Sequence, residues 1–209
     1  FTTGTSWQDY EASFTATSTT STLQIISKGS LSGTAALASD GGGLIIDHVQ
    51  VLATQTTAAY TEGGAPVVLS GTARVFDAEL SRLNTFNGAT LTLARNGGAN
   101  AEDVFSGSGT LSLTSGNVVV SGTTIGTYTN SGGTLQFTFN GSATQTLVNS
   151  AIQQIAYSNS SDGPPASAQI NWTFNDRNSG SQGSGGALTA TGSTTVTITG
   201  VNDAPTLTN

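Results

Sequence analysis

Short apolar-rich runs, separated by glycine, asparagine and serine, recur along the chain and constrain its fold more than any other feature. In residues 195–199 (TVTIT) two apolar residues alternate with threonines, and residues 134–139 (TLQFTF) repeat the pattern. A period of two buries one face of a strand and solvates the other. Many such runs with turn residues between them are typical of a β-sandwich or barrel. The predicted strands are residues 10–17, 22–27, 44–52, 67–69, 72–76, 90–94, 110–114, 117–120, 123–129, 134–139, 168–175 and 193–199.

Residues 143–155 (ATQTLVNSAIQQI) break this alternation. Five apolar residues there recur at helical spacing and share one face of a helix, namely Leu147, Val148, Ala151, Ile152 and Ile155. Asn140 or Ser142 is the expected N-cap. We predict one short helix that crosses between two sheets and serves packing.

The composition narrows the chemistry that is open to the chain. Its 209 residues include no Cys, one His, 12 acidic residues and 5 basic residues, with a formal charge of -7. Without Cys there is no disulfide scaffold, thiolate zinc site or cysteine nucleophile. Five scattered cations argue against nucleic acid as a partner, and no apolar run is long enough for a transmembrane helix, so we expect no membrane insertion. The remaining oxygen ligands suit calcium.

No constellation of residues predicts catalysis. Asp47 and His48 are the one pair of neighbouring acid and imidazole groups, and adjacent side chains of a strand face opposite ways. Nothing resembles the paired carboxylates of a glycosidase. We therefore expect that the protein is not an enzyme.

Eight short pieces stand in order within residues 54–205: 60–69 (YTEGGAPVVL), 75–79 (VFDAE), 88–93 (GATLTL), 101–103 (AED), 125–126 (IG), 155–159 (IAYSN), 174–177 (FNDR) and 201–205 (VNDAP). This series resembles the cadherin-like, immunoglobulin-type tandem repeats of large secreted bacterial surface proteins. The resemblance implies an all-β, Greek-key sandwich at the bacterial cell surface, with neighbouring repeats of the same protein as partners. It also implies roles in adhesion or in matrix formation.

Residues 1–53 differ from the rest of the chain. The pieces WQDY (7–10), FTAT (14–17), LQII (23–26) and LIIDHVQV (44–51) resemble the C-terminal part of a galactose-binding-like jelly roll. Three or four strands are too few to bury a core alone. The missing half lies upstream, or these strands complete a sheet in a neighbouring chain, or they pack on the second domain.

Two changes in composition predict the domain boundaries. Residues 53–59 (ATQTTAA) are polar without strong alternation, and Pro205 imposes an extended exit after a strand. We expect a partial jelly-roll-like unit at 1–53 and a cadherin-like sandwich at 54–203. Residues 204–209 would begin a following repeat or a linker.

Asp77, Glu79 and Asp176 form a first candidate calcium site. In an extended strand, Asp77 and Glu79 project to the same face and repel each other unless a cation relieves them. Asp176 lies near the end of another predicted strand, and the resemblance places both segments at the N-terminal pole of the sandwich. Carbonyls, an asparagine and water would complete the six to eight oxygens of calcium. The alternative is a solvated loop in which Asp176 pairs with a nearby arginine.

Glu62, Asp103, Asn202 and Asp203 form a second candidate calcium set. The resemblance implies that the early glutamate and the linker Asn-Asp meet at the C-terminal pole, where calcium would stiffen the joint to the next repeat. That next repeat would supply further carboxylates, so we expect an incomplete site here. The alternative for Asp203 is an ordinary turn before Pro205.

Trp7 and Tyr10 are a candidate platform for stacking a surface glycan, and core packing is the alternative for such aromatic residues. Three functions follow from these observations. The first is a calcium-stiffened spacer in an extracellular adhesin. The second is a subunit of a filament or sheath that is built by inter-chain strand completion, with other copies of the chain as partners. The third is a carbohydrate-binding module.

Overall fold

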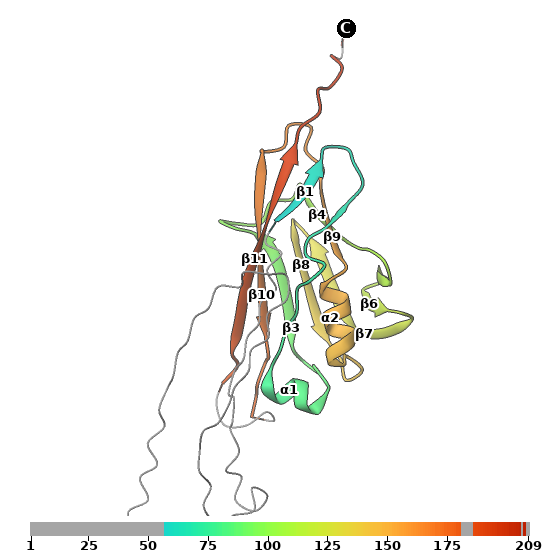
Figure 1. Ribbon diagram of the computed structural model, residues 1–209, viewed down its shortest axis with the longest axis vertical. Coiled ribbons are helices and arrows are strands. Elements are labelled where there is room, and N and C mark those ends of the chain that lie inside the picture. Colours follow the sequence, from blue (N-terminus) through green and yellow to red (C-terminus); the bar gives the residue numbers. More distant parts are fainter. Residues whose placement is uncertain (1–56, 181–185, 206, 208–209) are drawn as a thin grey trace, which may run out of the picture. The chain divides into compact units, whose positions relative to one another are not determined.

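The computed structural model describes residues 57–180, 186–205 and 207. Over these residues the chain is mostly β and forms two sheets (Figure 1). The larger is an eight-stranded mixed sheet, which contains β1 (Thr57–Thr61), β11 (Thr189–Thr199), β10 (Ser167–Asn175), β3 (Thr90–Arg95), β8 (Thr134–Phe139), β7 (Thr123–Ser131), β6 (Asn117–Val120) and β5 (Leu111–Thr114), in that order. The smaller sheet contains β2 (Val67–Val68), β9 (Ile155–Asn159) and β4 (Asp103–Gly107), in that order.

The predicted alternation is visible in the burial of the strands. Along β10, Ala168, Ile170, Trp172 and Phe174 are buried, while their neighbours are exposed or half-buried. Residues from both sheets enter one apolar core, in which Phe137 of the larger sheet and Tyr157 of the smaller sheet are fully buried. The apolar runs therefore fold as period-two strands because burying one face of each sheet removes their apolar side chains from water.

The predicted crossover helix is confirmed as α2 (Gln145–Ile152), which connects β8 of the larger sheet to β9 of the smaller sheet. Its buried residues are Val148, Ala151 and Ile152, all on the predicted face. The prediction of the N-cap was wrong: the side chain of Thr144 accepts a hydrogen bond from the Leu147 N–H. Neither helix among the described residues has the length and the apolar character needed to cross a membrane.

Residues 72–76, which were expected to be a strand, form none, and a second helix, α1 (Ala78–Leu83), follows them. The prediction that Asp77 and Glu79 lie together in one extended strand was wrong because Glu79 is in this helix and Asp77, although itself extended, is the helix N-cap. Its Oδ1 accepts hydrogen bonds from the N–H groups of Glu79 (3.1 Å) and Leu80 (2.8 Å), which the first turn of a helix leaves without partners. Only Leu80 of this helix is buried.

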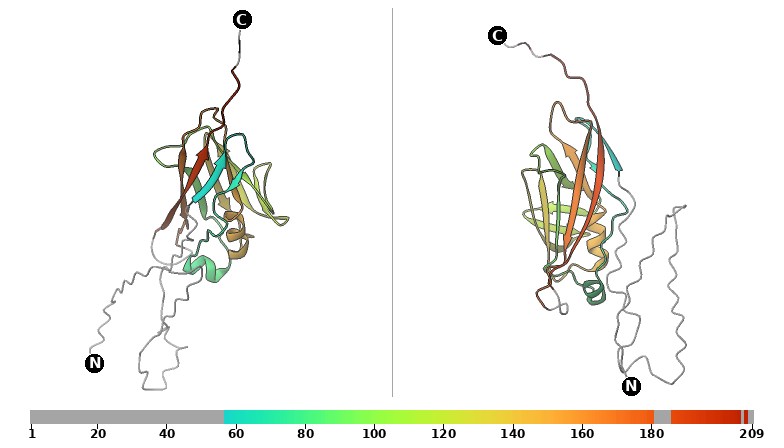
Figure 2. Two further views of the ribbon diagram at one scale, coloured as in Figure 1. Left: turned by 45° about the horizontal axis from the view of Figure 1, so that its top comes forward. Right: turned by 90° about the vertical axis from the view of Figure 1, so that its left-hand side faces the viewer.

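The polar segment that was expected to be a boundary, residues 53–59, ends inside a strand. β1 begins at Thr57 and pairs in parallel with β11, from Thr57 opposite Thr195 to Thr61 opposite Thr199. Figure 2 shows β1 and β11 side by side in both of its views. Among the described strands, β1 and β11 form the one parallel pair, and the first strand of the described domain therefore adjoins the last.

Candidate functional site

A buried carboxylate at the start of β4 organises the polar interior. Asp103 follows a turn in which its N–H donates to the Asn100 carbonyl, and its side chain has no exposed surface. Arg95, the last residue of β3, binds the Asp103 carboxylate through two nitrogens: Nε donates to Oδ2 at 2.7 Å and Nη2 donates to Oδ1 at 2.5 Å. Because β3 belongs to the larger sheet and β4 to the smaller, this bidentate ion pair connects the two sheets.

Side chains of β9 complete the network around the carboxylate. The hydroxyl of Tyr157 donates to Oδ1 of Asp103 at 2.6 Å, and Nδ2 of Asn159 donates to the same oxygen at 3.1 Å. The hydroxyl of Tyr60, on β1, donates to the Asn159 carbonyl at 3.2 Å. The rings of Tyr60 and Tyr157 meet edge to face, with their centroids 6.1 Å apart. Four strands (β1, β3, β4 and β9) from the two sheets thus share one polar cluster inside the apolar core.

The titration of the cluster follows from its surroundings. Burial raises the pKa of Tyr157 to about 12, and the hydrogen bond to the Asp103 carboxylate adds to this shift because it favours the protonated phenol. The same carboxylate, through its hydrogen bonds, raises the pKa of Arg95. At neutral pH the cluster therefore holds a neutral phenol and a charged guanidinium. The carboxylate, the guanidinium and the phenol of the cluster hydrogen-bond to one another, which suits a structural role.

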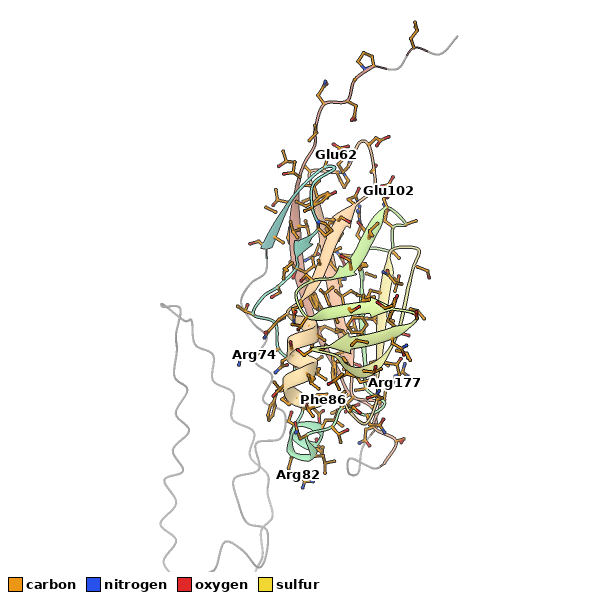
Figure 3. All side chains as sticks on the ribbon, turned by 90° about the vertical axis from the view of Figure 1, so that its right-hand side faces the viewer. Glu62, Arg74, Arg82, Phe86, Glu102 and Arg177 are labelled. Carbon is orange, nitrogen blue, oxygen red and sulfur yellow. The ribbon has the colours of Figure 1, made fainter. Side chains whose placement is uncertain are left out.

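Asp103 was predicted as part of the second calcium set, and in the structure its carboxylate is surrounded by hydrogen-bond donors of the protein. Glu62, of the same set, makes a different contact: its Oε2 accepts a 2.7 Å hydrogen bond from the Val201 N–H in the exit linker. Asn202 and Asp203 follow directly and are exposed. Figure 3 shows Glu62 and Glu102, the neighbour of Asp103, at the same end of the domain. Glu62 thus contacts the residue that directly precedes the Asn-Asp pair of the linker.

The residues of the first calcium set lie on two segments at one end of the fold. Phe76, next to Asp77, and Phe174, two residues before Asp176, line the same small pocket. Asp176 is buried, and its Oδ1 accepts from the N–H groups of Asn178 (3.0 Å) and Leu188 (2.8 Å). Asp176 thus directly follows β10, near a strand end as predicted, and accepts hydrogen bonds from the loop after it.

Within the described part of the chain, no group of three or more His, Cys, Asp or Glu side chains is placed to hold a metal ion. A calcium ion bound there would take most of its six to eight oxygens from backbone carbonyls, amides and water. Trp7 and Tyr10, the candidate glycan platform, lie outside the described residues, as does the whole predicted unit at 1–53.

The sequence analysis missed the partners of Asp103. Arg95 is one of only five basic residues and directly follows a predicted strand, which is a signal that a search for ion pairs could have used. Nothing in the sequence distinguishes Tyr157 and Asn159 from other polar strand residues. Only the fold places them next to Asp103.

Comparison of the chain with protein-family models, with curated proteins and with solved structures finds no match. What the fold defines is a mostly β protein with two sheets that share a core and a buried polar cluster.

Proposed function

We propose that the chain is an extracellular structural segment of a large bacterial surface protein, where it spaces neighbouring modules and links them mechanically. The finer architecture belongs to the same proposal: the two sheets would be the layers of a Greek-key, cadherin-like sandwich. The resemblance within residues 54–205 and the single core shared by both sheets support this assignment.

The observation that carries the proposal is the parallel pairing of β1 with β11. The described chain enters β1 at Thr57, opposite Thr195, and leaves β11 at Thr199, opposite Thr61. A pull that separates the start of β1 from the end of β11 therefore acts along both strands. Because the hydrogen bonds between them run across that direction, tension loads them together instead of opening them one at a time.

The residues that follow β11 are hydrogen-bonded to the end of β1. The Glu62 N–H donates to the Thr199 carbonyl at 2.9 Å, which continues the β1–β11 hydrogen-bonding pattern beyond β1. The Glu62 carboxylate also accepts from the Val201 N–H at 2.7 Å. The link between the domain and whatever follows it is thus restrained by one residue of the domain.

Single-molecule unfolding by force, applied through the two ends of the full chain, tests the proposal. Glu62 donates its N–H to Thr199, and backbone groups of a strand alternate between its two edges. The N–H groups of Tyr60 and Ala58 therefore face β11, while that of Ala59 faces away. Ala58→Pro removes a bond that is loaded in shear, and Ala59→Pro is the matched control.

We expect Ala58→Pro to lower the unfolding force clearly more than Ala59→Pro, since proline removes a donor at both positions but only the first donor crosses to β11. Equal forces for both variants and the unmodified chain would contradict a load-bearing role for this strand pair.

Calcium stiffening is the second part of the proposal. The supply of carboxylate, amide and carbonyl oxygens around Asp77 and Asp176 supports it. The test is thermal unfolding in calcium and in chelator, with Asp176→Asn compared with Asp162→Asn, an exposed acid in a loop. A calcium-induced rise in Tm that Asp176→Asn alone abolishes is the expected result. An unchanged Tm in the unmodified chain would exclude stiffening by calcium.

A filament subunit assembled by inter-chain strand completion is the alternative function. The observation that favours it is that, among the described strands, only β10 pairs with residues 189–194 of β11, since an unpaired edge is a template for another strand.

A further inference from the structure

The sequence contains three Asn-Gly dipeptides, at 87–88, 96–97 and 140–141, and all three lie in turns of the described chain. An asparagine that precedes glycine is prone to modify itself, because glycine has no side chain to keep its backbone nitrogen away from the asparagine side chain. The attack requires a backbone nitrogen that is free of a hydrogen bond and a side-chain amide that is free to leave. The three turns differ in both respects.

The turn at Asn96 leaves both groups accessible. The Gly98 N–H donates to the Arg95 carbonyl at 3.3 Å and closes a β-turn around Asn96 and Gly97, in which Gly97 has a φ of 82°. Asn96 and Gly97 are exposed. Among the described residues, nothing accepts a hydrogen bond from the Gly97 N–H or from the side-chain nitrogen of Asn96.

The turn at Asn87 is built in the same way but has a bonded nitrogen. The Ala89 N–H donates to the Phe86 carbonyl at 3.0 Å, and Gly88 has a φ of 85°. The Gly88 N–H, however, donates to the carbonyl of Phe139 at 2.9 Å. Attack by this nitrogen must first break that hydrogen bond, so the turn at Asn87 is a matched comparison within the same chain.

The side chain of Asn140 is held at both ends. Its Oδ1 accepts from the Ser142 N–H at 2.8 Å, its Nδ2 donates to the Thr124 carbonyl at 3.1 Å, and the residue is half-buried. The side-chain amide of Asn140 cannot leave without breaking its bond to Thr124. Asn96 is held only through its Oδ1, which accepts from Nδ2 of Asn171 at 3.0 Å.

We propose that Asn96 and Gly97 form a site of spontaneous covalent modification. The Gly97 nitrogen bonds to Cγ of Asn96 and gives up its proton to solvent, and the side-chain amide takes up a proton and leaves as ammonia, which closes a succinimide ring. Water then opens the ring at either carbonyl and yields aspartate or isoaspartate, without any oxidant or reductant. The proposal is independent of the proposed function, because it concerns the chemistry of one turn.

The two products act differently on the domain. Aspartate at position 96 keeps an oxygen that accepts from Asn171 and adds one negative charge. Isoaspartate adds a main-chain carbon directly after Arg95, whose side chain binds the Asp103 carboxylate. Because residues 96–102 lead from β3 in the larger sheet to β4 in the smaller, isoaspartate loosens the ion pair that connects the sheets.

Ageing of the unmodified full chain tests the proposal. Samples are kept at neutral pH in native buffer or in concentrated urea, and peptide mass spectrometry follows the replacement of amide by carboxyl at Asn87, Asn96 and Asn140. In native buffer we expect Asn96 to convert about tenfold faster than Asn87, since the hydrogen bond of Gly88 corresponds to roughly that factor. Asn96 should also convert faster than Asn140. In urea the three rates should be similar, because the turns are lost.

Two results would overturn the proposal. The first is conversion at Asn96 in native buffer that is no faster than at the other two asparagines. The second is the same ranking in urea, because the order would then not come from the fold. The variant Asn96→Gln is the control for the assignment: it should abolish conversion at position 96 and leave the rates at Asn87 and Asn140 unchanged.

The effect of isoaspartate on the ion pair has its own test. The aged fraction that an isoaspartate methyltransferase labels is separated and unfolded in urea, beside the variant Asn96→Asp, which carries the same added charge on a normal backbone. We expect the isoaspartate fraction to unfold at a lower urea concentration than Asn96→Asp. Equal midpoints would overturn the inferred link between this turn and the Arg95–Asp103 pair.

Discussion

The hydroxyl of Tyr157 donates a 2.6 Å hydrogen bond to Oδ1 of Asp103, from the central strand of the smaller sheet to one of its edge strands. The same carboxylate is held by Arg95 of the larger sheet. A buried charge is costly unless it is paired and hydrogen-bonded, so these donors together stabilise the carboxylate inside the fold. The cluster therefore fixes how the two sheets meet, which the non-directional packing of apolar residues does less strictly.

Removing the charge of Asp103 should destabilise the domain strongly. Asp103→Asn leaves the guanidinium of Arg95, which is only 17% exposed, without its carboxylate partner. We expect a loss of about 3 kcal/mol in the free energy of unfolding, because breaking a buried pair strands the remaining charge. Urea denaturation measures it. The exposed Asp162→Asn should change stability by less than about 0.5 kcal/mol, and similar losses in both variants would contradict the role given to Asp103.

Tyr157 should make the domain sensitive to alkali. Its pKa is about 12 in the folded state against 10.0 when unperturbed, so the unfolded chain releases this proton first as the pH rises. The contribution of Tyr157 is complete below pH 10 and is lost as the pH rises toward 12, by up to about 1.4 kcal/mol per pH unit. Denaturant midpoints measured between pH 9 and pH 12 follow the loss.

The variant Tyr157→Phe separates this effect from general alkaline unfolding. It removes one donor to Asp103 and should cost about 1 kcal/mol at pH 7, since Arg95 and Asn159 still satisfy the carboxylate. Its stability should also fall less steeply above pH 10 than that of the unmodified chain. Tyr128→Phe, which changes a partly buried tyrosine outside the cluster, should keep the steep fall. If both variants keep it, another group is responsible.

The sequence predicted the elements whose burial is strongly periodic. β8, β10 and the end of β11 bury alternate residues, and α2 buries one helical face, so the pattern of apolar residues carried the information. The sequence did not predict β1 because only Tyr60 of its five residues is buried, so the strand has no alternating apolar pattern. Its strand conformation is imposed by pairing with β11, whose sequence lies more than 130 residues away.

The local structure around the candidate site residues was missed for a similar reason. Asp77 beside Glu79 fits a strand as well as a helix start, and the N-cap hydrogen bonds that decide between them are local contacts that periodicity does not encode. Asp103 was assigned to the second calcium set by the resemblance, which gives no information on its burial. Its burial depends on Arg95 and Tyr157, which only the pairing of β4 with β9 and the meeting of the two sheets bring near.

The N-cap role of Asp77 can be separated from a calcium role by two substitutions. Asp77→Ala removes the oxygen that accepts from Glu79 and Leu80 and should cost about 1 kcal/mol. Asp77→Ser keeps a capping oxygen but lacks the carboxylate, so it should restore most of this stability in chelator. Urea denaturation of both variants measures the difference. Equal destabilisation by alanine and serine would contradict the capping role, and a calcium response that is lost in both would locate a ligand at Asp77.

Glu62 should control the mobility of the exit linker without controlling the stability of the core. Its carboxylate accepts from the Val201 N–H at 2.7 Å, and Val201 itself is 50% exposed, so this hydrogen bond holds the linker to the domain beyond Thr199. In Glu62→Ala the Val201 amide should exchange with solvent about tenfold faster, because a hydrogen bond of roughly 1.4 kcal/mol corresponds to that factor. Tm should fall by only a degree or two.

Glu102→Ala, at the same end of the domain, is the control and should leave the exchange rate of the Val201 amide unchanged (Figure 3). An unchanged exchange rate in Glu62→Ala would mean that the linker is oriented by its own backbone, and the joint to a following module would then not depend on this carboxylate.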